Sequence, residues 1–470
     1  MAGARRAAVL AVVIAVTAAP ADRAFAAGWS RPVVIAPRHF NPHDAVAVWT
    51  TGGHVVAVAN LQVPEQFAAF TSPGTGAFTA FGRLADHTPD FPHLVATPDG
   101  GVIAAYGGAD GAYTATSSGG RPFPTAKRLE GSDFASVPFL RAAPNGDVFA
   151  FWQTALCDSG CPPRNSVLVA ARRAGASEFD SPQQLSAPGL QSGAPQLVTD
   201  RNGGAIVAWV TGRDGSVDNL RLVYSIRPPS GAFGPERVVD PRPGVSGFRL
   251  ASRPDGRAVI SVNWLGVRPV EVASGTVGGG FGTPIPVGAR SGDGARVALG
   301  PSGGGLIGWL EGARPRSIRV AALRSGGVSR PRTLARGDVQ SLKLRIDARG
   351  RRIVGWRERG RLHVATWTGA RRPAQQVLGR RDSGFYSLAS TSRGIAIVVW
   401  SRSANGLHYA NAAVAVSGKR FGRPARLETP NGSPGGVSIA TGPGGRALAY
   451  WVEIPNRGFN NTLVARYYKP

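Results

Sequence analysis

The chain has 470 residues with 64 glycines and 37 prolines, and its 54 lysines and arginines exceed its 28 acidic residues, giving a formal net charge of +26. Short apolar runs lie between clusters of Gly, Pro, Asn and Asp, and no long segment has apolar residues at helical spacing, which favours an all-β protein. The sequence contains no Gly-rich nucleotide-binding loop between a strand and a helix, and beyond the N-terminus no run approaches the roughly 18 apolar residues of a membrane-spanning helix.

The N-terminus has the three parts of a secretory signal peptide. Arg5 and Arg6 precede an apolar run over residues 7–19, and small residues follow at 24–26 in the sequence AFA. Positive charge, a short apolar core and a small-residue cleavage site are typical of export signals. We therefore expect a signal peptide over residues 1–26 and a secreted, extracellular protein with a single domain over residues 27–470.

Residues 28–37, with the sequence GWSRPVVIAP, are predicted to form one short strand that has no hairpin partner beside it in the sequence. Five of the seven histidines follow before residue 94. Of these, His39, His43 and His87 are candidates for metal ligands, although the His-x3-His spacing of the first two suits a helix and here falls in a Pro-containing loop. The alternative is that they are solvated loop residues, and we expect no cofactor.

A turn glycine recurs nine times, at spacings of 44 to 57 residues, each time after a turn-forming residue and before an apolar strand. In five repeats proline stands two residues earlier, as in TPDGG; proline presets the first turn position, and glycine accepts the positive φ that closes a hairpin. An aromatic residue usually ends the strand six residues later. The period suits four strands per repeat, so we predict an all-β propeller of four-stranded blades. The glycines are Gly53, Gly100, Gly146, Gly203, Gly256, Gly303, Gly350, Gly394 and Gly445.

A second signature closes each repeat: an aromatic or apolar residue, proline three residues later, and an aliphatic residue three after that, as in Phe421-Pro424-Leu427. Proline cannot donate a ladder hydrogen bond, so this signature marks an outer strand. The ninth repeat reaches Pro470 without it, whereas Trp29-Pro32-Ile35 has the same spacing. We therefore expect residues 28–37 to complete the last blade and close the ring, with the number of blades left open.

The two cysteines of the sequence, Cys157 and Cys161, lie in an insert between the second and third strands of the third repeat. In an exported chain a small disulfide is the expected state of such a pair. A redox pair or a metal clip are the alternatives.

One position of the repeat, seven residues before the turn glycine, carries a cation in three successive repeats: Arg249, Arg296 and Lys343. The next residue is apolar in every repeat, so we expect this position to face away from the packed side, at the beginning of the inner strand and the mouth of the central channel. Arginine forks bind carboxylate, sulfate or phosphate in bidentate fashion. His93 and Gln196 occupy the same position and complete the predicted ligand-binding set; alternatively, the position is solvated and tolerates any polar residue.

The net charge is concentrated in one part of the chain. Residues 291–382 contain 20 basic and 6 acidic residues, a net charge of +14. Such a segment attracts polyanions, and no nucleic-acid motif with interleaved aromatic residues accompanies it. The alternative is that the excess of arginine reflects the composition of the genome and not a ligand.

The blade pattern resembles that of the secreted sialidase-like propellers, whose blades carry Asp-box (BNR) repeats. The segments SGAFGPERVV, residues 230–239, and SGKRFGRPARL, residues 417–427, lie where that family places its Asp-box. The Ser-x-Asp-x-Gly-x-Thr-Trp spacing itself is absent, and the family's catalytic residues have no match in this sequence. The resemblance implies a propeller fold and export, and does not imply hydrolysis.

Two classes of function remain. The first is a non-enzymatic binding propeller for an anionic glycan, a cell-envelope polymer or a protein partner; the second is a glycan-active enzyme, a glycosidase or lyase. Glycoside hydrolysis needs two carboxylates that flank the bond, and no pair is recognisable among the loop-face aspartates. We expect a monomer with no membrane span and no specific nucleic-acid partner. The aspartates are Asp44, Asp86, Asp90, Asp133, Asp214 and Asp218.

Overall fold

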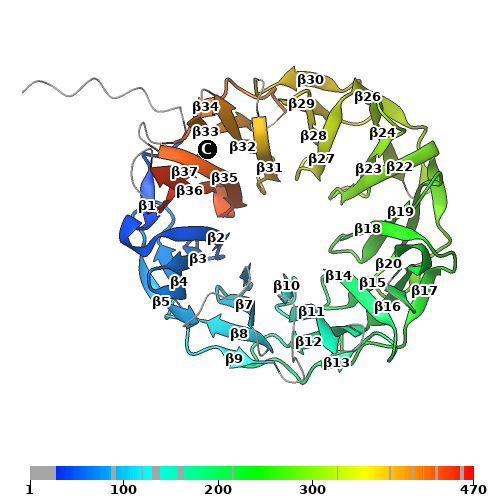
Figure 1. The fold of residues 1–470 in the computed structure, drawn as a ribbon, viewed down its shortest axis with the longest axis horizontal. Helices are drawn as coiled ribbons and strands as arrows, with labels where there is room; N and C mark the ends of the chain where they lie inside the picture. The colour runs from blue at the N-terminus through cyan, green and yellow to red at the C-terminus, as the bar shows by residue number, and fades with distance from the viewer. Residues whose placement is uncertain are drawn as a thin grey trace, which may run out of the picture.

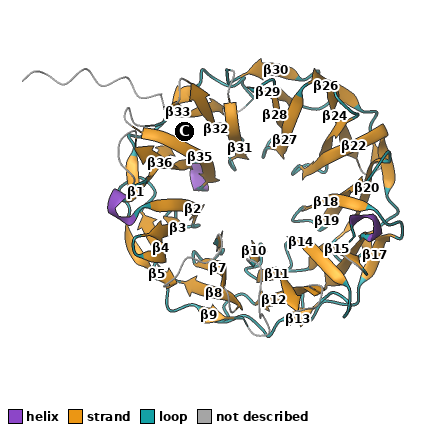
Figure 2. Cartoon of the chain, viewed as in Figure 1, coloured by secondary structure: helices purple, strands orange, loops and turns teal. Residues whose placement is uncertain are grey.

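The strands form a ring of twisted sheets around a central axis (Figure 1). The computed structural model describes residues 28–85, 92–108, 111–118, 120–129, 138–156, 164–213, 216–324, 327–380, 383–404, 407–416, 418–428, 432–455 and 460–470. Over these residues the only helical elements are three short 3-10 turns, η1 (Arg38–Phe40), η2 (Val217–Asn219) and η3 (Pro443–Gly445) (Figure 2). No described helix has the length and apolar character needed to cross a membrane.

Each repeat of the sequence forms one unit of the ring, numbered in chain order. Unit 1 comprises β2 (Pro42–Trp49), β3 (Val55–Gln62), β4 (Glu65–Ser72) and β5 (Thr79–Ala85). Unit 2 comprises β6 (His93–Ala96), β7 (Val102–Gly108), β8 (Gly111–Ser117) and β9 (Lys127–Arg128). Unit 3 comprises β10 (Phe139–Ala142), β11 (Val148–Leu156), β12 (Arg164–Arg172) and β13 (Gln183–Gln184). Unit 4 comprises β14 (Gln191–Thr199), β15 (Ala205–Gly212), β16 (Arg221–Arg227) and β17 (Arg237–Asp240).

The remaining units continue around the ring. Unit 5 comprises β18 (Val245–Ser252), β19 (Arg257–Trp264), β20 (Pro269–Thr276), β21 (Gly280–Phe281) and the first part of β22 (Ile285–Leu299). Unit 6 comprises the rest of β22, β23 (Gly305–Glu311), β24 (Arg316–Arg324), β25 (Gly327–Val328) and β26 (Arg332–Gly337). Unit 7 comprises β27 (Val339–Ile346), β28 (Arg352–Glu358), β29 (Arg361–Trp367) and β30 (Ala374–Val377). Unit 8 comprises β31 (Ser383–Ser390), β32 (Ala396–Ala404), β33 (Leu407–Ala415) and β34 (Ala425–Arg426). Unit 9 comprises β35 (Gly432–Thr441), β36 (Ala447–Pro455), β37 (Thr462–Tyr468) and β1 (Val33–Ala36).

The strands within each unit pair antiparallel, with the first strand nearest the axis (Figure 1). Across the described residues the strands form eight sheets, of which seven have four strands and one has nine. The larger sheet contains units 5 and 6 because β22 pairs with β20 at its start and with β23 at its end. The predicted β-propeller is therefore confirmed, and each of the nine repeats contributes a unit.

The turn glycines join the first and second strands of each unit, as predicted. At Gly350 the amide donates to the Asp347 carbonyl over 2.9 Å, and φ is 75°, a backbone conformation that residues with a Cβ rarely adopt. The other eight glycines also have positive φ. The short first connection of every unit is thus encoded locally.

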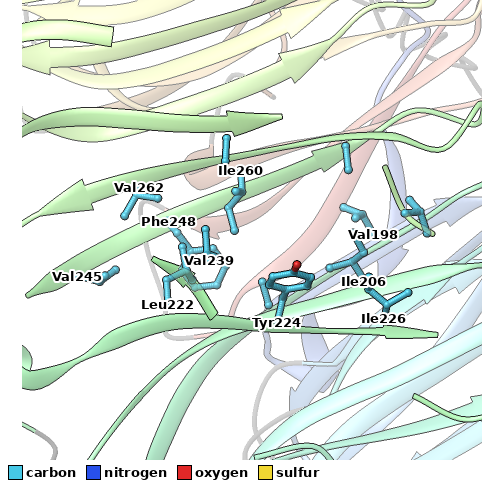
Figure 3. Close-up of a cluster of buried hydrophobic side chains, with 14 of the residues drawn as sticks. Val198, Ile206, Leu222, Tyr224, Ile226, Val239, Val245, Phe248, Ile260 and Val262 are labelled. Atoms are coloured by element: carbon cyan, nitrogen blue, oxygen red, sulfur yellow. The ribbon is translucent and has the colours of Figure 1, made fainter. Parts of the chain in front are cut away.

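The core consists of apolar layers between neighbouring units. Figure 3 shows the layer between units 4 and 5, where Tyr224 of β16, Phe248 of β18 and Ile260 of β19 belong to one buried cluster. The aromatic residue predicted to end the second strand lies inside it, as Trp209 does in β15. It packs toward the preceding unit, and Trp209 shares a buried cluster with Phe149 and Phe151. Burial of large aromatic residues is the main source of stability in such layers.

The N-terminal strand closes the ring. Val33 of β1 pairs with Ala465 of β37, and Trp29 forms a further antiparallel bridge with Tyr468. The Lys469 amide also donates to the Gly28 carbonyl over 2.8 Å. This confirms the prediction made from the proline spacing, and the closure covers the edge of β37, which would otherwise be exposed.

Candidate binding site in the central hollow

The predicted cationic position lies in the middle of the inner strands and not at their beginning, which corrects the expectation from the sequence. Arg249, Arg296 and Lys343 are each followed by at least three further strand residues before the hairpin turn. In several units a β-bulge precedes this position, and the inner strand begins before the bulge. Such a bulge inserts one extra residue and redirects the side chains that follow it.

The bulges share an unusual backbone conformation. In units 6 and 7 the pairing shifts by one residue directly before Arg296 and Lys343. Gly294 and Ser341, two residues before these cations, have φ values of 61° and 56°. The Tyr386 hydroxyl lies within hydrogen-bond distance of the Ser341 carbonyl, so a side chain from unit 8 supports the bulge of unit 7.

The inner strands of units 5 to 9 surround a hollow with a volume of about 560 Å³, called the central hollow below. Its lining combines the three cations with a fourth, Arg345, and with hydroxyl groups from units 8 and 9. Apolar side chains complete it. The polar lining residues are Arg249, Arg296, Lys343, Arg345, Ser387, Ser390 and Thr441.

The four cations have no ion-pair partner among the described residues. The nearest acidic residue in the strand, Asp293, instead faces Arg316 at 3.3 Å. Arg249 and Arg296 donate to carbonyl oxygens of their own strands, at 2.9 Å to Phe248 and 3.0 Å to Ala295. These bonds orient each guanidinium and leave its remaining N–H groups available to a ligand.

Burial and mutual repulsion shift the pKa values of this group. Burial lowers the pKa of Lys343 below its ordinary 10.5, and the nearby Arg345 and Arg296 lower it further. Burial also lowers the pKa of Arg296, with an added contribution from Arg249. The Lys343 side chain is exposed to solvent within the hollow, and the inner strands of five units around it remove part of its hydration.

Lys343 is held by the neighbouring unit. Its ammonium donates to the carbonyl oxygen of Tyr386 and lies 5.0 Å from the centre of that tyrosine ring. The phenol is buried, which raises the pKa of Tyr386, so this hydroxyl stays protonated. Lys343 is therefore positioned by Tyr386 of unit 8.

His93 and Gln196 occupy the same repeat position but do not line the central hollow. The side-chain amide of Gln196 forms two hydrogen bonds with unit 5. It donates to the Phe248 carbonyl over 3.0 Å and accepts from the Leu250 amide over 3.1 Å. The His93 ring lies 4.5 Å from the ring of Phe139 on the next inner strand, and burial lowers the pKa of His93. These contacts join neighbouring inner strands, so ligand binding by these two residues stays a prediction.

Arg345 and the hydroxyl groups were missed in the sequence. Arg345 lies two residues after Lys343 and therefore on the same face of β27, because side chains alternate along a strand. Burial lowers its pKa as well. Following every second residue of each inner strand, in addition to one position per repeat, would have found it.

The remaining candidates do not form a site in the described part of the chain. His39 belongs to η1, and its ring lies 4.1 Å from the Phe40 ring at a tilt of 47°, whereas His43 is an exposed residue of β2. Burial raises the pKa of Asp44. The described residues contain no cluster of three His, Cys, Asp or Glu residues that could hold a metal ion. Outside the described residues lie the predicted signal peptide, His87, Cys157, Cys161, Asp86, Asp90, Asp133 and Asp214.

Comparison with known proteins shows similarity of fold. No protein-family model matches the sequence, and no curated protein matches it either. Among solved structures, an ulvan lyase from a new family of polysaccharide lyases is 11% identical, with 93% of each chain covered and a TM-score of 0.41. An α-L-arabinanase from Penicillium chrysogenum is 12% identical over 94% of this chain and 98% of that one, with a TM-score of 0.37. Prolyl oligopeptidase B from Galerina marginata is 10% identical over 88% of this chain and 56% of that one, with a TM-score of 0.47. Such distant similarity concerns the fold alone.

Proposed function

We propose that this chain is an exported, non-enzymatic binding protein that holds an anionic glycan in its central hollow. The observation that carries the proposal is the group of four lining cations, which have no carboxylate within ion-pair distance among the described residues. Clustered cations repel one another and are partly desolvated, which disfavours their charged forms. The charge of an anionic ligand would offset both penalties through its attraction to each cation.

The lining favours a sugar over a simple anion. Cations from units 5 to 7 share the hollow with the hydroxyl groups of Ser387, Ser390 and Thr441 from units 8 and 9. A uronic acid or sulfated sugar carries the matching groups, an oxyanion for the arginine forks and hydroxyls for the neutral side. Cell-envelope polymers with acidic sugars present the same chemistry. The proposal of export rests on the predicted signal peptide, residues 1–26.

Binding fits this lining better than catalysis does. A glycosidase would need two carboxylates that flank the bond, and the described residues that line the hollow are cations, hydroxyls and apolar groups. A protein partner would need a wider surface than this hollow offers.

The test is calorimetric titration with a uronic-acid tetrasaccharide at low and high salt, beside a neutral tetrasaccharide of the same linkage. We expect binding of the acidic sugar that weakens with salt, because screening reduces contacts between charges. The triple variant R249Q/R296Q/K343Q should lose about 100-fold in affinity or more, since each charge-assisted hydrogen bond contributes about 1.5–3 kcal/mol.

The matched control removes the same charge from the outer surface of unit 7. Arg371, Arg372 and Arg380 are exposed, and R371Q/R372Q/R380Q should weaken binding only about twofold, because diffuse charge steers a ligand without positioning it. Equal losses in both triple variants would reduce the central hollow to part of a general basic surface. No binding of the acidic sugar by the unaltered protein would refute the proposal.

A further inference from the structure

A second group of arginines lies at the outer edge of the ring, between units 6 and 7. It lines a separate hollow with a volume of about 290 Å³, called the outer pocket below. The arginines come from β24, from the β25–β26 connection, from the start of β26 and from β28, whereas the central hollow is lined by inner strands. They are Arg324, Arg330, Arg332 and Arg352.

These arginines have no carboxylate within ion-pair distance in the described part of the chain. Burial lowers the pKa of Arg352, and the positive charges of Arg324 and Arg332 lower it further. Four cations thus converge on a space that offers no counter-charge. Arg324, Arg330 and Arg332 are exposed to solvent, so a ligand can reach them. Guanidinium groups gathered in this way suit an oxyanion, which they bind through paired N–H donors.

Two of the four are oriented by the loop after β29. Arg352 Nη1 donates to the Gly369 carbonyl over 2.6 Å. Arg332 Nη1 lies 3.3 Å from the carbonyl oxygens of both Ala370 and Arg371. The guanidinium groups of Arg324 and Arg330 have no hydrogen-bond partner among the described residues, so their donors remain available.

The remaining wall of the outer pocket is apolar. Leu306, Val320 and Trp367, which are 1%, 2% and 7% exposed, border the space beside the arginines. The volume lies near the lower end of the range for small-molecule sites and exceeds what an inorganic ion needs. A ligand that fits has an oxyanion for the arginines and a ring with an apolar face for this wall.

We infer that the outer pocket is a second binding site, for a single sugar residue that carries a sulfate or carboxylate group. It shares no lining residue with the central hollow. A glycan bound there would occupy the rim of the ring while the axis remains free. The inference stands independently of the function proposed for the central hollow.

The test uses the full chain carrying R249Q/R296Q/K343Q/R345Q, which removes all four cations of the central hollow, so that binding there does not contribute. Methyl glucoside 6-sulfate and methyl glucuronide are titrated by calorimetry, with methyl glucoside as the neutral probe. We expect at least one anionic probe to bind and the neutral probe to show no binding. Adding R324Q/R330Q should weaken that binding about tenfold or more, as expected for the loss of charge-assisted hydrogen bonds. Preference for one anionic probe identifies which oxyanion the pocket takes.

The matched control is R121Q/R173Q, which removes the same charge from exposed positions next to units 2 and 3. Its affinity should change less than about twofold, and the melting temperature should be the same in both double variants. Equal weakening by the two double variants would overturn the inference, as would failure of both anionic probes to bind. Because the central cations are absent from every protein in the series, neither outcome bears on the central hollow.

Discussion

Arginine has opposite surroundings in two regions of this ring. In the layers between units, Arg351 is 3% exposed, and its Nε donates to Asp347 over 2.9 Å while its other nitrogens reach the carbonyls of Lys419, Gly394 and Ala415. In the central hollow, Arg249 and Arg296 contact only carbonyl oxygens of their own strands and have no carboxylate partner in the described chain. The fold thus uses the N–H donors of the arginine between the units, whereas most donors of the arginines in the central hollow remain available to a ligand.

The buried kind follows a pattern between units. Arg227 of unit 4 lies 3.4 Å from Asp147 of unit 3 and donates to the Gly203 carbonyl over 2.9 Å, much as Arg351 reaches the Gly394 carbonyl. In both cases a guanidinium satisfies the carbonyl of a turn glycine that would otherwise be buried without a partner. A cation with this many partners is structural. A cluster without such partners relies on water, salt ions or a ligand to offset the repulsion between its charges. This difference separates candidate sites from the scaffold.

The largest expected effect comes from breaking the buried arrangement. Arg351→Met leaves the Asp347 carboxylate and three carbonyl groups with fewer partners in a region that water reaches poorly. We expect a loss of about 3–5 kcal/mol in the free energy of unfolding, typical of removing one member of a buried ion pair. Denaturant unfolding followed by tryptophan fluorescence measures it.

Arg349→Met is the matched control, two residues away on the same turn. Arg349 is exposed and uses only its backbone amide to reach Asp347. Its substitution should change the unfolding free energy by no more than about 0.5 kcal/mol. Similar losses in both variants would mean that the buried ion pair contributes nothing particular to stability.

An intermediate effect is expected at Arg296, in the central hollow. Arg296→Gln removes a partly desolvated charge that Arg249 repels. The unfolding free energy should stay within about 0.5 kcal/mol of the unaltered protein and change in the stabilising direction. Affinity for the uronic-acid tetrasaccharide should fall about tenfold.

Thermal unfolding and calorimetry on the same sample separate these two quantities. A clear loss of stability in Arg296→Gln would place this residue with the structural arginines, and the comparison between the two regions would fail. Unchanged affinity would remove Arg296 from the binding site while leaving the other cations to be tested.

The parts that the sequence predicted correctly are those set by local chemistry. Turn glycines such as Gly350 need a positive φ, and the proline at position 32 marks an outer strand, so the repeat and its closure follow from short patterns. The middle of the inner strands was less accessible to prediction. The bulge at Ser341 places a non-glycine residue at φ 56°, supported by Tyr386 from the next unit. Nothing in the residues near Ser341 signals that contact, which exists only once the units are packed.

The smallest effect concerns pH and distinguishes the lysine of the hollow from its arginines. Burial and the charges of Arg345 and Arg296 lower the pKa of Lys343 below its ordinary 10.5. As pH rises toward that value, folded Lys343 loses its proton before an unfolded lysine does, so the affinity for an anionic sugar should fall in this range. The free energy of unfolding changes in the opposite direction. In this pH range the unfolded chain binds more protons than the folded one, so the lysine's contribution to the unfolding free energy rises with pH.

Lys343→Arg keeps its charge throughout this range, so we expect nearly unchanged binding at neutral pH and no decline in affinity at alkaline pH. Titrations of both proteins with the uronic-acid tetrasaccharide across the alkaline range measure the difference, and the same decline in both would show that Lys343 does not carry the charge that the ligand meets.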